Sequence, residues 1–131
     1  MDLFSIKQDS YIVAVDYYSD YWEVKQLDKT TAEHVIQFCK EQFSRHGIPQ
    51  TIVTDNGPQF TNREFAKFTK DWELVHVTSS PTHSQSNGKA ESAVKIVKSI
   101  LKKSQRDGND KWLAILDWRN APSEGQSSSP V

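Results

Sequence analysis

Residues 50–60 read QTIVTDNGPQF, and the rest of the chain is best interpreted outward from this stretch. Ile52 and Val53 belong to a β-branched run that is typical of a buried strand. Asp55 follows the run directly, with Asn56 and Gly57 behind it. These three residue types favour turns, so a turn explains the pattern when it is taken alone. A carboxylate at the end of a parallel strand would instead face the crevice where open α/β sheets bind ligands.

Strands and helices can be placed on both sides of this stretch. Apolar and β-branched runs bounded by turn residues predict five strands, at residues 2–6, 11–18, 22–27, 50–54 and 73–77. Apolar residues at helical spacing predict helices from Thr30 to Gly47, from Thr61 to Trp72, over about 88–105, and over 111–120. Two capping boxes, Thr30 with Glu33 and Thr61 with Glu64, would begin the first two helices.

The order of these elements predicts the fold class. Three strands joined by tight turns suggest an antiparallel meander, and the later strand–helix–strand crossovers require parallel pairing. We therefore expect an α/β fold with a mixed five-stranded sheet and helices on both of its faces. The chain should form a single domain over residues 1–131, with about the last ten residues loose.

Composition excludes several classes of protein. The 131 residues are 36% hydrophobic and 25% charged, an ordinary globular mixture, and the net charge of −1 does not indicate a general polyanion binder. A role on DNA would therefore depend on a local basic patch. Cys39 has no partner cysteine for a disulfide or a zinc site, and no apolar run is long enough to span a membrane. The composition thus suggests an intracellular protein.

A second carboxylate, Glu91, lies in the first turns of the predicted long helix. On a helical projection it falls within roughly 60° of Lys95, Lys98 and Lys102, beside an apolar arc about 120° wide. The ordinary interpretation is a solvated face with Glu–Lys pairs four residues apart, which add a few tenths of a kcal/mol. The alternative is that a phosphate backbone follows the lysines and ends at a metal ion beside Glu91.

Two motifs together resemble a known family. TDNGPQF (54–60) and SQSNGKAES (84–92) place 35 residues between Asp55 and Glu91. This pattern resembles the D-D-35-E catalytic core of retroviral and LTR-retrotransposon integrases, most closely that of gypsy-type elements, which has a ribonuclease-H-like fold. DYYSDYWEV (16–24) and RNAPSEGQSSSPV (119–131) are also similar to that group, so the resemblance covers nearly the whole chain.

The family has a third acid, and the sequence offers two candidates. Asp16 closes an apolar strand, whereas the family pattern points to Asp2 in the first strand. If Gln8 and Asp9 form the turn, Asp2 pairs with about Val15, and Asp16 points to the opposite sheet face. We therefore expect Asp2 to be the catalytic residue, and Asp16 to accept hydrogen bonds in the turn at Ser19.

The resemblance implies a metal-dependent enzyme. Asp2, Asp55 and Glu91 would be the catalytic residues and the ligands of Mg²⁺ or Mn²⁺, with two ions about 3.5–4 Å apart when substrate is bound. Asp2 would bridge both ions, and each of the other two acids would hold one. The reaction would be 3′-end processing, an endonucleolytic step, followed by strand transfer of element DNA into chromosomal DNA.

The resemblance also implies partners. The DNA of element ends and target duplex would contact Asn56, Gly57, Asn87, Lys95 and Lys98. The family forms homodimers or higher oligomers, and action on chromosomal DNA implies a nuclear location. Trp112 and its apolar neighbours in the last helix could contribute to a dimer, although core packing explains most of them.

Several departures from the family pattern keep other hypotheses open. The first strand is short, Ser84 stands where many relatives have proline, and the family's zinc-binding and C-terminal DNA-binding domains are absent. The chain could therefore be an inert, domesticated integrase remnant that binds DNA or another protein. A ribonuclease H acting on RNA–DNA hybrids would share the fold and the metals, but the two quoted motifs favour an integrase.

Overall fold

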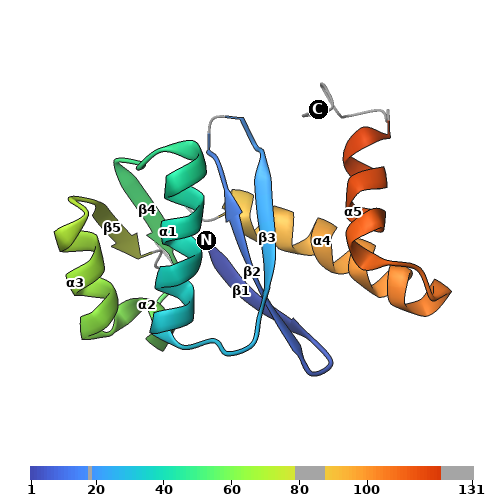
Figure 1. Cartoon of the computed structure of the whole chain (residues 1–131), viewed down its shortest axis with the longest axis horizontal. Helices are drawn as coiled ribbons and strands as arrows, with labels where there is room; N and C mark the ends of the chain where they lie inside the picture. The colour runs from blue at the N-terminus through green and yellow to red at the C-terminus, as the bar shows by residue number, and fades with distance from the viewer. Residues whose placement is uncertain (18, 79–87, 122–131) are drawn as a thin grey trace.

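The computed structural model describes residues 1–17, 19–78 and 88–121. Its elements are β1 (Asp2–Ile6), β2 (Asp9–Val15), β3 (Trp22–Leu27), α1 (Ala32–His46), β4 (Thr51–Thr54), α2 (Pro58–Thr61), α3 (Arg63–Asp71), β5 (Val75–Thr78), α4 (Gly88–Asp107) and α5 (Lys111–Asn120). The mixed α/β architecture predicted from the sequence is confirmed, with antiparallel and parallel strands and helices around them (Figure 1). The segments 79–87 and 122–131, which include the expected loose end, lie outside the described residues.

Strands β1, β2 and β3 form the expected antiparallel meander. The turn between β1 and β2 falls on Lys7 and Gln8 rather than on Gln8 and Asp9, and Lys7 takes a left-handed conformation with φ 55°. Asp2 is consequently opposite Val13, two residues from the expected Val15. A slip of two residues keeps every side chain on its face, so Asp2 still lies on the face of Val13 and Val15.

Strands β4 and β5 pair in parallel and form a separate two-stranded group. The five strands therefore do not make one continuous hydrogen-bonded sheet as we expected. Just before β1, the Met1 ammonium donates a hydrogen bond of 2.7 Å to the Val53 carbonyl of β4. This bond links the start of the meander to the second group of strands.

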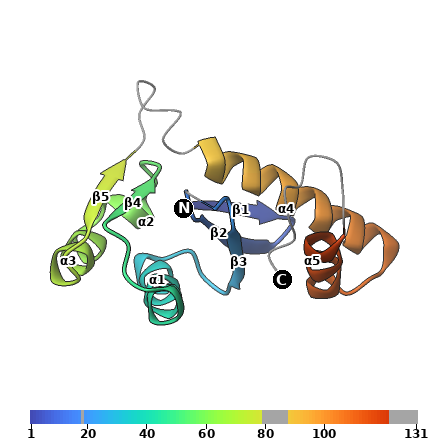
Figure 2. The same ribbon diagram turned by 90° about the horizontal axis from the view of Figure 1, so that it is seen from above.

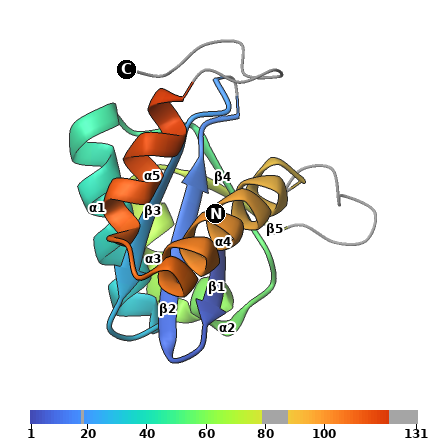
Figure 3. The same ribbon diagram turned by 90° about the vertical axis from the view of Figure 1, so that its right-hand side faces the viewer.

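Two hydrophobic cores lie on opposite faces of the meander. Figure 2 shows α4 along one face and α1 on the other, and Figure 3 shows α4 crossing β1 and β2. Tyr11 and Val13 point toward α4, where they pack with Val97 and Leu101. Ile12 points to the other face, into a core formed with residues of α1, α2 and α3. Asp2, which pairs with Val13, therefore lies on the α4 face.

The helices begin at residues close to the expected ones. Thr31 rather than Thr30 caps α1, since its hydroxyl accepts the His34 N–H at 3.5 Å. Asn62 rather than Thr61 caps α3, accepting the Phe65 N–H at 2.9 Å. The reason is that Pro58 starts the short helix α2, and Thr61 is its last residue.

Among residues 1–17, 19–78 and 88–121, no helix is long and apolar enough to cross a membrane.

Candidate active site

The three predicted acids come from three different elements. Asp2 is the first residue of β1, and its Oδ1 accepts the Leu3 N–H at 2.9 Å. Asp55 follows the last residue of β4, and its Oδ1 accepts the Gly57 N–H at 2.8 Å. Glu91 is exposed in the first turn of α4. A backbone amide therefore orients each aspartate, while Glu91 depends on the placement of its helix.

Asp2 lies within electrostatic reach of both other acids. Burial raises the pKa of Asp2 above its ordinary 3.8, and the negative charges of Asp55 and Glu91 raise it further. The Leu3 N–H and the Met1 ammonium act in the opposite direction, and they do not reverse the shift. The fold thus concentrates negative charge around Asp2, as a binding site for a cation requires.

The donor set suits a hard divalent cation, because Mg²⁺ and Mn²⁺ prefer carboxylate oxygens. The carboxylates are farther apart than the ligands of an occupied metal site. Within residues 1–17, 19–78 and 88–121, no three His, Cys, Asp or Glu side chains stand close enough together to hold an ion as they are placed. The residues fit such an ion in chemistry and charge, and the acids would have to come closer together to complete the site.

The predicted DNA-binding residues fall into two groups, with Asn87 outside the described residues. Asn56 is exposed and Gly57 half-buried immediately after Asp55, so both lie at the acidic site. On α4, Lys95 is exposed, whereas Lys98 is half-buried with its ammonium 5.7 Å from the centre of the Phe4 ring. Lys95 therefore presents its charge to solvent more fully than Lys98 does.

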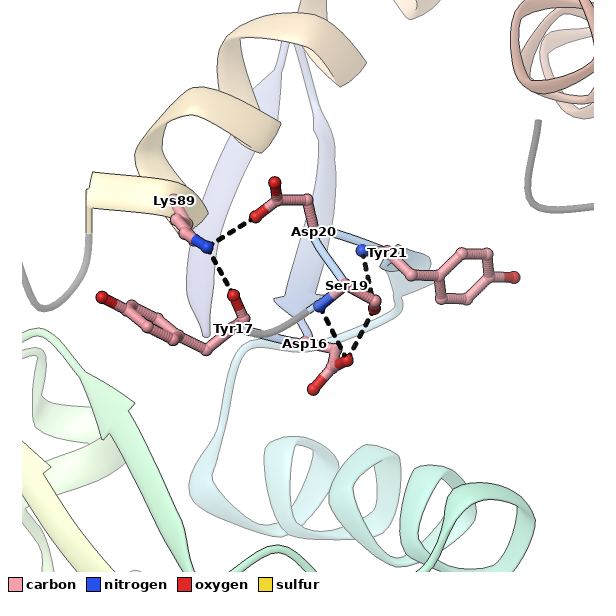
Figure 4. Close-up of polar contacts among 6 residues, drawn as sticks. All are labelled: Asp16, Tyr17, Ser19, Asp20, Tyr21 and Lys89. Atoms are coloured by element: carbon pink, nitrogen blue, oxygen red, sulfur yellow. Dashed lines mark hydrogen bonds and ion pairs between the residues drawn. The ribbon is translucent and has the colours of Figure 1, made fainter. Parts of the chain in front are cut away.

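Asp16 has the structural role expected of it. Its Oδ2 accepts the Ser19 hydroxyl at 2.6 Å and the Ser19 N–H at 3.2 Å. Both bonds close the loop between β2 and β3 (Figure 4).

Two residues that were not predicted from the sequence, Thr54 and His76, support the backbone of Asp55. Thr54 is fully buried, and its hydroxyl lies 2.7 Å from Nε2 of His76 and donates to the Asp55 carbonyl at 2.9 Å. The centres of the His76 and Phe65 rings are 4.8 Å apart. Burial lowers the pKa of His76 below its usual 6.5. A buried polar residue at the end of β4 was the available signal, since such a group needs a partner.

Comparison with known proteins identifies the family. Residues 1–84 match the integrase core domain family. The chain belongs to this family. An uncharacterized protein of Caenorhabditis elegans is 34% identical over 122 residues, covering 90% of this chain and 10% of that protein. The Pol-related polyprotein of a mouse intracisternal A-particle is 35% identical over 95 residues, covering 72% of this chain and 11% of that protein.

Solved structures of retroviral integrases share the fold. The magnesium complex of the HTLV-2 integrase catalytic core domain, in a trimeric form, has a TM-score of 0.72 and 26% identity. The match covers 97% of this chain and 86% of that one. This integrase core therefore spans nearly a whole catalytic core domain, but only about a tenth of the length of the two polypeptides above.

Proposed function

We propose that this integrase core is the catalytic part of a Mg²⁺- or Mn²⁺-dependent polynucleotidyl transferase that processes the 3′ ends of element DNA and joins them to chromosomal DNA. What carries the proposal is that Asp2, in a chain of the integrase core family, lies within electrostatic reach of both Asp55 and Glu91. Three acids from β1, β4 and α4 thus share one electrostatic environment in a chain of the integrase core family.

Each residue of the site has a separate task in this proposal. Asp2, Asp55 and Glu91 would hold the metal ions, which supply an activated water or 3′ hydroxyl and stabilise the leaving oxygen. The Gly57 N–H orients the Asp55 carboxylate, and the absence of a side chain at Gly57 leaves room beside it. Thr54 and His76 fix the backbone at the end of β4. No protein nucleophile is needed.

Element ends and target duplex would be bound by residues around the acids. Asn56 and Gly57, which follow Asp55, and the exposed Lys95 on the helix of Glu91 support this role, and we assign Lys98 and Asn87 the same role from the family motif. Because chromosomal DNA is the target, the protein would act in the nucleus. The exposed Trp112, Leu113 and Leu116 on α5 suit the formation of a homodimer or a higher oligomer.

One observation favours a second candidate, an inert integrase remnant that binds DNA or protein. In the described part of the chain the acids do not stand close enough to hold an ion as they are placed. A remnant selected only for folding has no need to complete the site.

Metal-dependent stability separates the two candidates. Thermal unfolding would be followed with and without Mn²⁺ for the natural chain, for Asp55→Asn, and for Asp28→Asn, in which the changed residue is an exposed aspartate outside the site. A metal gain of roughly RT ln(1 + [Mn²⁺]/Kd) that only Asp55→Asn loses would support the enzyme. No gain in a folded chain would sink it and favour the remnant. Strand transfer of a DNA end, compared with cleavage of an RNA–DNA hybrid, would then identify the substrate.

A further inference from the structure

The loop between β2 and β3 meets the first turn of α4, although Asp20 and Lys89 are far apart in the sequence. The Lys89 ammonium forms an ion pair of 2.8 Å with the Asp20 carboxylate. It also donates a hydrogen bond to the Tyr17 carbonyl and lies 4.2 Å from the centre of the Tyr17 ring (Figure 4). Lys89 thus has three contacts with one loop, and it is separated from Glu91 by a single residue.

The loop offers a firm attachment point. Asp16 is bonded to Ser19 through its carboxylate, and its backbone N–H bonds to the Tyr21 carbonyl at 2.8 Å. Asp20 takes φ 61°, a conformation that aspartate tolerates better than most residues, and its N–H bonds to the Asp16 carbonyl at 2.9 Å. These bonds hold the backbone of the loop, and the Asp20 carboxylate meets the Lys89 ammonium of α4 (Figure 4).

Helix formation alone does not explain a lysine at this position. The amino-terminal end of a helix carries partial positive charge, so an ammonium group in the first turn is unfavourable there unless an anion compensates it. The buried apolar residues nearest this end of the helix are small, namely Ala90 in the first turn and Ala93 just after it. Small side chains bury little area and restrain the rotation of the turn weakly. The contacts of Lys89 with the loop supply that restraint.

We propose that Lys89 is a positioning residue, which holds the first turn of α4 against the Asp20 loop so that Glu91 is directed toward Asp2 and Asp55. Residues two apart on a helix point to nearly opposite sides, so fixing Lys89 on the loop also fixes where Glu91 points. This inference rests on the proposed function, because it takes Glu91 to be a metal ligand.

The test measures Mn²⁺ affinity without DNA and without turnover, by the electron paramagnetic resonance signal of free Mn²⁺. Lys89→Ala should weaken Mn²⁺ binding about tenfold, the lower end of the range for residues that orient metal ligands. If Lys89 acted only through its charge, its removal would strengthen Mn²⁺ binding, because a nearby positive charge repels a cation. A positioning role and a charge effect therefore predict opposite changes in Mn²⁺ affinity. Lys89→Arg, which can keep the ion pair and the ring contact, should retain most of the affinity.

Two controls make the result specific. Lys103→Ala removes an exposed lysine from the same helix far from Glu91 and should leave the affinity unchanged. Hydrogen exchange at the amides of Ser92 and Ala93, which follow the first turn, should be faster in Lys89→Ala than in Lys103→Ala.

The outcomes separate this inference from the proposed function. If the natural chain binds no Mn²⁺, or if Glu91→Gln binds it as well as the natural chain, Glu91 is not a metal ligand and the inference loses its basis. If Glu91→Gln weakens binding while Lys89→Ala leaves it equal or tighter, the function stands and the positioning role of Lys89 is wrong.

Discussion

Gly57→Ala should damage the acidic site while leaving the fold intact. The backbone of Gly57 has φ −59° and ψ 148°, which any residue can adopt, so alanine introduces no backbone strain. A Cβ atom at this position would lie 3.0 Å from Oδ1 of Asp55 and 2.9 Å from Oε1 of Gln59. The Gln59 side chain can rotate away. The Asp55 Oδ1 atom lies there because it accepts the Gly57 N–H at 2.8 Å. The added Cβ atom would therefore push this oxygen, a predicted metal ligand, away from its position.

The size of the effect follows from these distances. Relief of the contact needs a shift of about 0.4 Å, whereas metal ligands tolerate roughly 0.2 Å, so we expect a loss of about tenfold in Mn²⁺ affinity. With Mn²⁺ at about ten times the Kd of the natural chain, the metal stabilises that chain by about 1.4 kcal/mol and the variant by about 0.4 kcal/mol. The difference of about 1 kcal/mol corresponds to roughly 3–5 °C in Tm for a domain of this size.

The assay is thermal unfolding with and without Mn²⁺, and Gly88→Ala is the matched control. Among the described residues, a Cβ atom on Gly88, at the start of α4, has no neighbour within 4 Å. Gly88→Ala should keep the full increase in Tm on addition of Mn²⁺. It should also be up to about 1 kcal/mol more stable than the natural chain, because alanine is the better helix former. If Gly57→Ala keeps the full gain while Asp55→Asn loses it, the absence of a side chain at Gly57 does not control the Asp55 carboxylate.

Three further predictions concern protonation and packing. The pKa of Asp2 is raised above 3.8 in the folded protein. The free energy of unfolding of the metal-free protein should therefore decrease as pH rises through that pKa and Asp2 ionises. Asp2→Asn should therefore melt higher than the natural chain at pH 7 and converge with it below about pH 4; a lower Tm at pH 7 would contradict this. Because the pKa of His76 is lowered, the folded protein loses stability as pH falls from about 6.5 toward that pKa. The Tm of His76→Gln should therefore fall less than the Tm of the natural chain between pH 7 and pH 5. Val97→Ala empties a site with 0% exposure and should cost about 2 kcal/mol in urea unfolding, whereas Val75→Ala, 59% exposed, should change stability by less than about 0.5 kcal/mol.

Much of the fold could be predicted because the signals are local. The β-branched run at 51–54 became β4 almost residue for residue, and the apolar arc of α4 is the face that packs on β1 and β2. The predicted sheet face of Asp2 is unchanged by the different register, because a strand alternates its side chains and Asp2 stays on the face of Val13 and Val15. Its catalytic role stays a prediction. The helix caps were misplaced by one residue, since Pro58 and the tertiary packing decide which of two neighbouring polar residues starts a helix.

Local patterns along the chain predict all the strands and every helix except the short α2, the sheet face of Asp2, and the motif spacing between Asp55 and Glu91. Those properties depend on periodicity and on chemistry close along the chain. Tertiary structure decided which residues support the acids. The bond between Thr54 and His76 and the ion pair between Asp20 and Lys89 join segments that carry no mutual signal in the sequence. Their partners are selected by how β4 meets β5 and how α4 lies across the meander, and only packing in three dimensions sets those arrangements.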